Sequence, residues 1–254
     1  MTDRFIPQEG RRARRPFFVA LLGMGVLWGV LCAPSPALAA GQTYTITSFD
    51  SIRVAAPVRV VLRTGVGVSA KGEGDRAALD RISLSVSGGL LTVSIRREAD
   101  GALSSATSGA PVTLTLSTGS LRRASILGGG SIAIDRIKGQ RADLLIGGSG
   151  DLSVGQVAVD RLTLLIGGSG KMTVAGTAGM LDARVNGPGA IAGEGLVART
   201  ATVLNDGPGT VHLSATVSAR VAASGSGDTA VDGKAACTVS QRGTGRITCA
   251  GKGY

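Results

Sequence analysis

The acidic residues offer one route to chemistry, because two or three carboxylates that converge in one cleft can cleave a polysaccharide by acid–base catalysis. Aspartates recur near the expected corners of the chain, at Asp135, Asp160 and Asp182. Two of them are followed at once by arginine, as Arg136 and Arg161, which is typical of solvated charge pairs. We therefore expect no catalytic residue and a non-catalytic function. A β-helical polysaccharide hydrolase or lyase is the alternative.

The chain contains a single histidine, His212. It stands between Val211 and Leu213, so in a strand it faces outward if those two residues face inward. One such histidine supports neither a Ser–His–acid relay nor a cluster of metal ligands. We expect a solvated surface histidine, no metal site and no cofactor.

Two glycine-rich segments resemble ligand-binding loops but lack residues that those loops need. Around Gly168–Lys171, Leu165 stands where a phosphate loop requires its first glycine, and Met172 replaces the hydroxyl residue. Gly147–Asp151 resembles the calcium-binding nonapeptide, but Leu152 occupies the acidic position and the period is twenty rather than nine. Both segments are better explained as chain corners.

The basic residues are the strongest indication of a binding function. The chain has 27 Lys and Arg against 17 Asp and Glu, a formal net charge of +10. Arg141, Arg161, Arg199 and Arg220 each precede a glycine corner by seven to ten residues. If the turns stack in register, these side chains form a loose positive stripe that attracts anionic glycans or lipopolysaccharide phosphates. The alternatives are a solubilising outer face and contact with another envelope protein.

The N-terminus has the pattern of an export signal. Four arginines at positions 11, 12, 14 and 15 precede the apolar run Phe17–Ala33, and Ala37–Ala39 offers a small-residue cleavage site. The run is short for a membrane span. We expect residues 1–39 to be removed, leaving no transmembrane segment. The location is then the periplasm, the outer surface or the medium of a bacterium.

Few aromatic residues remain after that cleavage, namely Tyr44, Phe49 and Tyr254. Single-stranded nucleic acids and neutral glycans are usually bound by stacking on exposed rings. Export and the shortage of rings together indicate that nucleic acid is not a partner.

A glycine repeat organises the second half of the chain. Leu144–Gly150 recurs twenty residues later as Leu164–Gly170. Gly-x-Gly pairs continue at intervals of 18 to 20 residues, ending at positions 130, 150, 170, 189, 209, 227 and 245. A period near twenty is typical of a stacked repeat architecture.

Alternation within one unit predicts which side chains build its core. In Asp151–Gly170 the expected inward residues are Leu152, Val154, Val157, Val159, Leu162, Leu164 and Ile166. One turn cannot bury them alone, so successive turns must stack. The corner glycines are expected to allow backbone angles, including positive φ, that tight corners need.

These patterns predict an all-β protein. Its second part, residues 125–254, is a β-helix, or solenoid, of short strands with turns of 18 to 20 residues, for which we favour a right-handed coil. A less regular β section at 40–124 precedes it, and 40–254 is expected to form one continuous elongated domain. A Greek-key sandwich is the alternative, although it does not require equally spaced corners.

Within the leading section the same reading predicts short elements. The expected strands are Thr43–Thr47, Ser51–Val54, Pro57–Leu62, Ile82–Val86, Leu90–Ile95 and Val112–Leu116. Arg76–Arg81 is the expected helical turn, Ser87–Gly89 a hairpin turn, and Ala99–Ala110 a loop.

Cys237 and Cys249 are the cysteines that remain after the expected cleavage. Export permits their oxidation, and a bond between them would hold the last turn, which lacks a neighbour. Closing a loop of this length stabilises by about 3 kcal/mol if unstrained.

The order of segments also carries a family resemblance: Phe49–Ile52, Val58–Leu62, Gly89–Val93 and the Gly-Ser-Gly-Asp corners at Gly148–Asp151 and Gly225–Asp228. In this order they resemble the GIN-domain family, the autotransporter-adhesin head domains of bacterial envelopes, over Thr43–Ile247. The resemblance implies an exported β-helical fold without a catalytic signature. We therefore predict a non-catalytic, exported cell-envelope binding module of the adhesin type.

Overall fold

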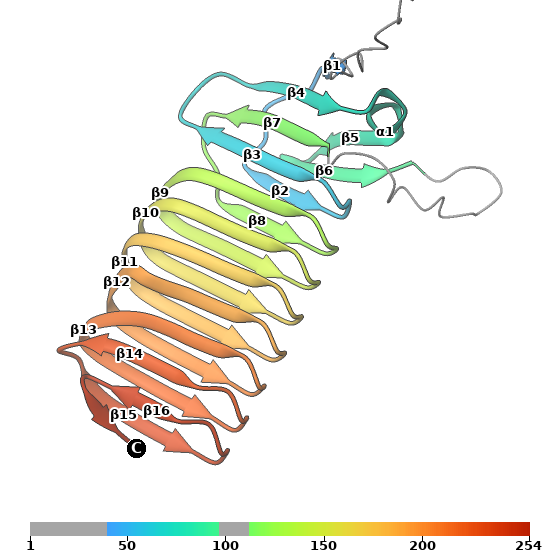
Figure 1. Cartoon of the computed structure of the whole chain (residues 1–254). Coiled ribbons are helices and arrows are strands. Elements are labelled where there is room, and N and C mark those ends of the chain that lie inside the picture. Colours follow the sequence, from blue (N-terminus) through green and yellow to red (C-terminus); the bar gives the residue numbers. More distant parts are fainter. Residues whose placement is uncertain (1–39, 97–111) are drawn as a thin grey trace, which may run out of the picture. The chain divides into compact units, whose positions relative to one another are not determined.

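A computed structural model describes residues 40–96 and 112–254 of the 254-residue chain (Figure 1). The described residues belong to one compact unit, Leu38–Tyr254. They form seventeen strands, joined in one hydrogen-bonded network, and one short helix. The predicted export signal at 1–39 and the predicted loop at 99–110 lie outside the described residues.

The leading section combines antiparallel and parallel pairs. Its elements are β1 (Ala40–Thr43), β2 (Ser51–Val54), β3 (Arg59–Thr64), β4 (Ser69–Gly74), α1 (Arg76–Arg81), β5 (Ile82–Ser87), β6 (Leu90–Ile95), β7 (Thr113–Thr118) and β8 (Arg123–Ile126). Strand β4 pairs antiparallel with β1 and β7, and β5 pairs antiparallel with β6. Strand β2 lies parallel to β6 and β8, and β3 lies parallel to β7 and β9. This section therefore leads directly into the repeat.

Most of the short elements were predicted correctly. The helical turn α1 is capped by Asp75, whose side chain accepts from the Ala78 N–H at 3.0 Å. Gly88 and Gly89 have φ of 56° and 77°, as a two-residue hairpin between β5 and β6 requires.

The predicted strand Thr43–Thr47 is wrong beyond its first residue. Strand β1 ends at Thr43, after which the Tyr44 N–H donates to the Ala70 carbonyl at 2.9 Å. The alternation that suggested a strand is real, because Tyr44 and Ile46 are half-buried between exposed threonines. Alternation reports which side chains face the core, and it does not supply a neighbouring strand to pair with.

The repeat half is a stack of parallel coils (Figure 1). Strands β9 (Ser131–Ile146), β10 (Asp151–Ile166), β11 (Lys171–Val185), β12 (Ala190–Asn205) and β13 (Thr210–Ala223) each bend around most of one turn and pair parallel with the next. The last turns are divided into β14 (Thr229–Gly233), β15 (Ala236–Gln241), β16 (Ile247–Cys249) and β17 (Lys252–Gly253). This arrangement confirms the β-solenoid and excludes the Greek-key sandwich.

The core runs through the turns as columns of aliphatic side chains. All seven residues predicted to face inward in Asp151–Gly170 are buried, with exposed fractions of 7% or less. Register explains the continuity, since Leu152 aligns with Ile132 on one side and Met172 on the other. Burial of such columns by neighbouring turns is the main source of stability in a solenoid.

The glycine corners also stack, but not for the predicted reason. None of the Gly-x-Gly corner residues of the repeat has positive φ. Instead, a Cβ added at Gly148 would lie 2.5 Å from the carbonyl oxygen of Gly128, its equivalent one turn earlier. The same close approach recurs from Gly168 to Gly243. Glycine is required because the corner of each turn lies against the backbone of the previous one.

A buried amide, Asn205, interrupts one of the columns. Asn205 aligns with Val185 and Ala223 and is fully buried. Its amide Nδ2 donates to the Gly209 carbonyl at 2.8 Å and to the Gly227 carbonyl at 3.3 Å. The side chain therefore joins the corners of two successive turns.

The last turn is closed by the predicted disulfide. Cys237 in β15 and Cys249 in β16 are bonded, with their Cα atoms 6.2 Å apart. The two strands lie on different sides of the coil. Strand β15 pairs with the second half of β13, whereas β16 pairs with β14, which itself pairs with the first half of β13. The bond therefore crosses the last turn of the described chain.

Candidate binding face

Register places two of the predicted arginines side by side. Arg141 on β9 aligns with Arg161 on β10, and both side chains are exposed. On the next turns the same position is occupied by Met180 and then Thr200. The positive column is therefore two residues long.

A shallow groove of about 440 Å³ lies along this column. Its lining includes the two arginines, together with Thr163, Met180, Asp182 and Thr200. Each comes from the outward-facing positions of β9 to β12, where alternation leaves every second side chain outside the core. Cations, hydroxyls and a thioether thus share one concave surface.

The two aligned arginines of the groove differ in their ion pairs, because Arg141 has a carboxylate partner and Arg161 has none in the described chain. Arg141 Nε lies 3.0 Å from Asp143 Oδ1, and Arg123 Nη2 lies 3.2 Å from Asp143 Oδ2. Partial burial raises the pKa of Asp143, but hydrogen bonds from Arg141 and Arg123 outweigh it, so that the pKa lies below its usual value. Within residues 40–96 and 112–254, no carboxylate lies within ion-pair distance of Arg161. Arg161 is the free cation of the groove.

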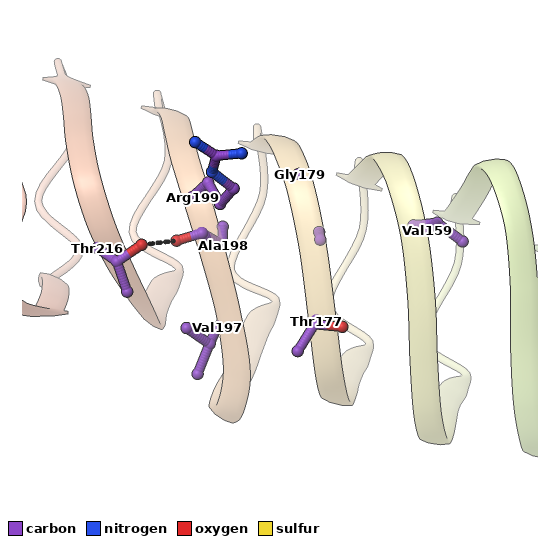
Figure 2. Close-up of a pocket in the computed structure, with 8 residues that line it drawn as sticks. Val159, Thr177, Gly179, Val197, Ala198, Arg199 and Thr216 are labelled. Carbon is purple, nitrogen blue, oxygen red and sulfur yellow. Dashed lines mark hydrogen bonds between the residues drawn. The ribbon is translucent and has the colours of Figure 1, made fainter.

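The other two predicted arginines do not extend this column. Arg220 aligns with Thr202, in the neighbouring column that also contains Asp182 and Thr163. Arg199 stands at the corner before that face, where it lines a separate hollow (Figure 2). The structure thus brings together Arg141 and Arg161, and leaves Arg199 and Arg220 apart from them.

The three aspartates considered for catalysis occupy different positions along the turn. Asp135 accepts hydrogen bonds from the Thr64 N–H and hydroxyl at 3.0 and 3.1 Å, so it is held by the backbone of β3. Asp160 lies at the corner opposite Gly179. Asp182 is on the groove face and is paired with Arg184 at 3.0 Å. They do not converge on one cleft.

The expected charge pairs form only in part. Arg136 Nε lies 3.6 Å from Asp135 Oδ2, as predicted. Asp160 and Arg161 make no such pair in the described chain, although they are also consecutive. Asp160 lies at the corner, and Arg161 is the first residue of the groove face that follows it.

His212 faces outward as predicted, but it is not simply solvated. Its Nε2 lies 2.6 Å from Asp232 Oδ2, and its Nδ1 lies 3.3 Å from Glu194 Oε1. The hydrogen bond with Asp232 is the largest influence and raises the pKa of His212 above its usual value. Sequence reasoning missed these contacts, although both acids follow a corner glycine by five residues and the histidine follows one by three.

Two further observations limit the chemistry of the described chain. In residues 40–96 and 112–254, no group of three or more His, Cys, Asp or Glu is placed to hold a metal ion. Nor does that part of the chain contain a helix long and apolar enough to cross a bilayer.

Parallel coils, stacked glycine corners and an outward basic groove define a β-solenoid protein. The chain matches, over residues 48–235, the family described as "Putative auto-transporter adhesin, head GIN domain", and it belongs to that family. The resemblance seen in the sequence is thereby confirmed. No match was found among curated protein sequences.

Solved structures show the same fold at low sequence identity. A crystal structure described as a putative adhesin from Bacteroides fragilis is 20% identical, with a TM-score of 0.75, and the match covers 83% of this chain and 96% of that one. One described as a putative lipid binding protein from Parabacteroides distasonis is 20% identical, with a TM-score of 0.67 and coverage of 84% and 96%. A third, a putative adhesin from Parabacteroides merdae, is 16% identical, with a TM-score of 0.63 and the same coverage.

Proposed function

We propose that this protein is a non-catalytic, exported cell-envelope module of the adhesin type. Its groove at Arg141 and Arg161 binds an anionic ligand, such as an acidic glycan or the phosphates of lipopolysaccharide. Membership of the GIN-domain family supports the adhesin role. The export signal pattern at residues 1–39 supports the location outside the cytoplasm.

The observation that indicates an anionic ligand is that Arg161, which has no ion-pair partner in the described chain, lies beside a second cation, Arg141. Parallel strands lie about 4.8 Å apart, so Arg161 and Arg141 stand close enough to repel each other. Asp143 offsets that repulsion for Arg141 but not for Arg161. A phosphate, sulfate or carboxylate group in the groove would supply the missing negative charge, and the arginine fork suits such planar or multidentate acceptors.

The rest of the groove suits a sugar better than a flat aromatic ligand. Thr202 offers a hydroxyl group beside the cations, and the Thr200 hydroxyl, which donates to the Gly179 carbonyl at 3.4 Å, can still accept a hydrogen bond. Among the residues that the structure describes, no aromatic side chain lines the groove. Recognition by charge and hydroxyl hydrogen bonds is therefore favoured over stacking, and its affinity should fall steeply with salt.

The test is retention on immobilised lipopolysaccharide and on a heparin column, with elution by a salt gradient. Arg161→Glu should elute at lower salt than the wild type, and Arg141→Glu/Arg161→Glu earlier still, with affinity at least about tenfold weaker. Arg220→Glu is the matched control, since Arg220 also makes no ion pair in the described chain and carries the same charge change outside the groove. Equal elution of the double variant and the wild type would remove the groove as the site. Equal losses from Arg161→Glu and Arg220→Glu would indicate a merely solubilising charge.

A further inference from the structure

We propose that one corner of the solenoid docks on a bilayer surface rich in anionic phospholipids. This corner patch consists of Met180, Val197, Arg199 and Val217, and only Met180 also borders the groove. The proposal does not depend on the groove or its ligand. It rests on where apolar and cationic side chains meet at the outside of β11 to β13.

Three large apolar side chains are exposed here on three consecutive turns. The exposed fractions are 47% for Met180, 42% for Val197 and 53% for Val217. Register places Met180 and Val217 on the turns either side of Arg199, because Met180 aligns with Thr200, which follows Arg199, and Thr200 aligns with Ser218, which follows Val217. Val197 lies two residues before Arg199 on the same outward side of β12. Single exposed apolar residues need no explanation, but a contiguous patch marks an interaction surface.

The surface around Val197 is hollowed between the turns. A hollow of about 270 Å³ is lined by Val159, Thr177, Ala178, Val197 and Thr216, with Arg199 at its side. Figure 2 shows Val197 and Arg199 projecting from one turn and Thr177 from the next. The Thr216 hydroxyl donates to the Ala198 carbonyl at 3.3 Å, so this polar group is already satisfied within the protein. What remains open to a partner is mostly apolar, with one guanidinium beside it.

Charge favours an anionic partner at this corner. Arg199 has no carboxylate within ion-pair distance in the described part of the chain. Asp160 lies two turns away, at about 10 Å from the spacing of parallel strands. The carboxylate of Glu194 faces His212 instead. An arginine at the surface is attracted by anionic headgroups, while apolar side chains beside it enter the headgroup and acyl boundary.

A bilayer suits the patch better than a second copy of this chain. A two-fold contact centred on this corner would bring each Arg199 toward its own image, and like charges oppose such a contact. The patch also lies on the outside of a bend, where apolar side chains project and no aromatic anchor is present. A fluid interface accepts such projections without a complementary pocket.

The test is co-sedimentation with vesicles of equal parts phosphatidylglycerol and phosphatidylcholine, and with phosphatidylcholine alone. The processed protein is purified from producing cells, and its N-terminus is determined by mass spectrometry. The wild type should partition onto the anionic vesicles. Val197→Ser/Val217→Ser should reduce partitioning about tenfold. About half of each valine side chain is exposed, and in the wild type this apolar surface moves from water into the membrane. Arg199→Glu should reduce it about 30-fold, as one attraction is replaced by a repulsion.

Matched controls lie elsewhere on the surface. Val66→Ser/Val68→Ser removes two valines exposed by 51% and 38%, and Arg63→Glu makes the same charge change on β3. Both should bind vesicles like the wild type, and all variants should melt at the wild-type temperature.

Three results would overturn the proposal. The first is a wild type that does not bind the anionic vesicles, or corner variants that bind as well as it does. The second is loss of binding in Arg141→Glu/Arg161→Glu alone, which would place the lipid in the groove. The third is concentration-dependent self-association that Val197→Ser/Val217→Ser abolishes without vesicles, which would assign the patch to a second copy. A failed groove test with intact vesicle binding would leave the corner proposal standing.

Discussion

Replacing one corner glycine with alanine tests why the repeat needs glycine at all. In Gly148→Ala the new methyl carbon would lie 2.5 Å from the carbonyl oxygen of Gly128. That is roughly 0.8 Å closer than the 3.3 Å at which carbon and carbonyl oxygen ordinarily meet. The obstacle is backbone, so no side-chain rotation can relieve it.

The cost follows from what the obstructed carbonyl does. Gly128 O accepts from the Gly150 N–H at 3.1 Å, and this bond joins two turns at their corners. Moving it aside weakens a hydrogen bond with a net value of about 1 kcal/mol and adds about 1–3 kcal/mol of overpacking. Alanine returns about 0.4–1 kcal/mol by restricting the unfolded chain. The free energy of unfolding should therefore fall by about 1–3 kcal/mol.

Guanidinium denaturation followed by far-ultraviolet circular dichroism measures this change. The control is Gly167→Ala, directly before the corner of the next turn, where the nearest atom to a new Cβ is the Ile146 carbonyl oxygen at 4.0 Å. It should leave the protein as stable as the wild type or stabilise it by up to about 1 kcal/mol. If both variants lose the same stability, then glycine is needed at these corners for its backbone freedom, and the close approach of turns is not the reason.

Two further predictions concern the last turns. Cys249→Ser should lower the free energy of unfolding by about 3 kcal/mol, because the bond with Cys237 closes a loop of twelve residues. As a control, a reducing agent should destabilise the wild type and leave the stability of the variant unchanged. The raised pKa of His212 means that its contacts stabilise the fold fully below the unfolded-state value near 6.5 and lose that effect as pH rises through the folded-state pKa. The ring is 39% exposed, so the effect should stay below about 1 kcal/mol. Titration by nuclear magnetic resonance should give a lower pKa in Asp232→Asn; an unchanged value would contradict the assignment.

The sequence alone determined the architecture. Glycine corners every 18 to 20 residues and alternation between them predicted which side chains of Asp151–Gly170 are buried. Both signals are local, because strand geometry sends successive side chains to opposite sides whatever the neighbouring turn contains. The disulfide was also predictable, since only two cysteines remain after the expected cleavage.

Only the tertiary structure decided which outward residues are neighbours. Turn lengths differ by one or two residues, and the pairing shifts between Ala192 and Val197 and again before Thr200. Positions counted from a glycine therefore drift. Arg220 follows Gly209 by eleven residues, as Arg161 follows Gly150, yet it lies outside the column of Arg161. Arg199 directly precedes Thr200, the member of that column on its own turn. His212 aligns with Ala192 and Ala230, but it contacts Glu194 and Asp232, which lie two residues further along those neighbouring turns. Counting equal distances from the corner glycines does not reveal such diagonal contacts.

The role of the corner glycines likewise depends on the stack. A sequence shows that glycine recurs, but not whether the backbone bends through positive φ or lies against another backbone. Here the second cause holds, because parallel turns bring equivalent corners into direct contact. Contacts between residues twenty positions apart depend on the register between turns, which local pattern does not encode.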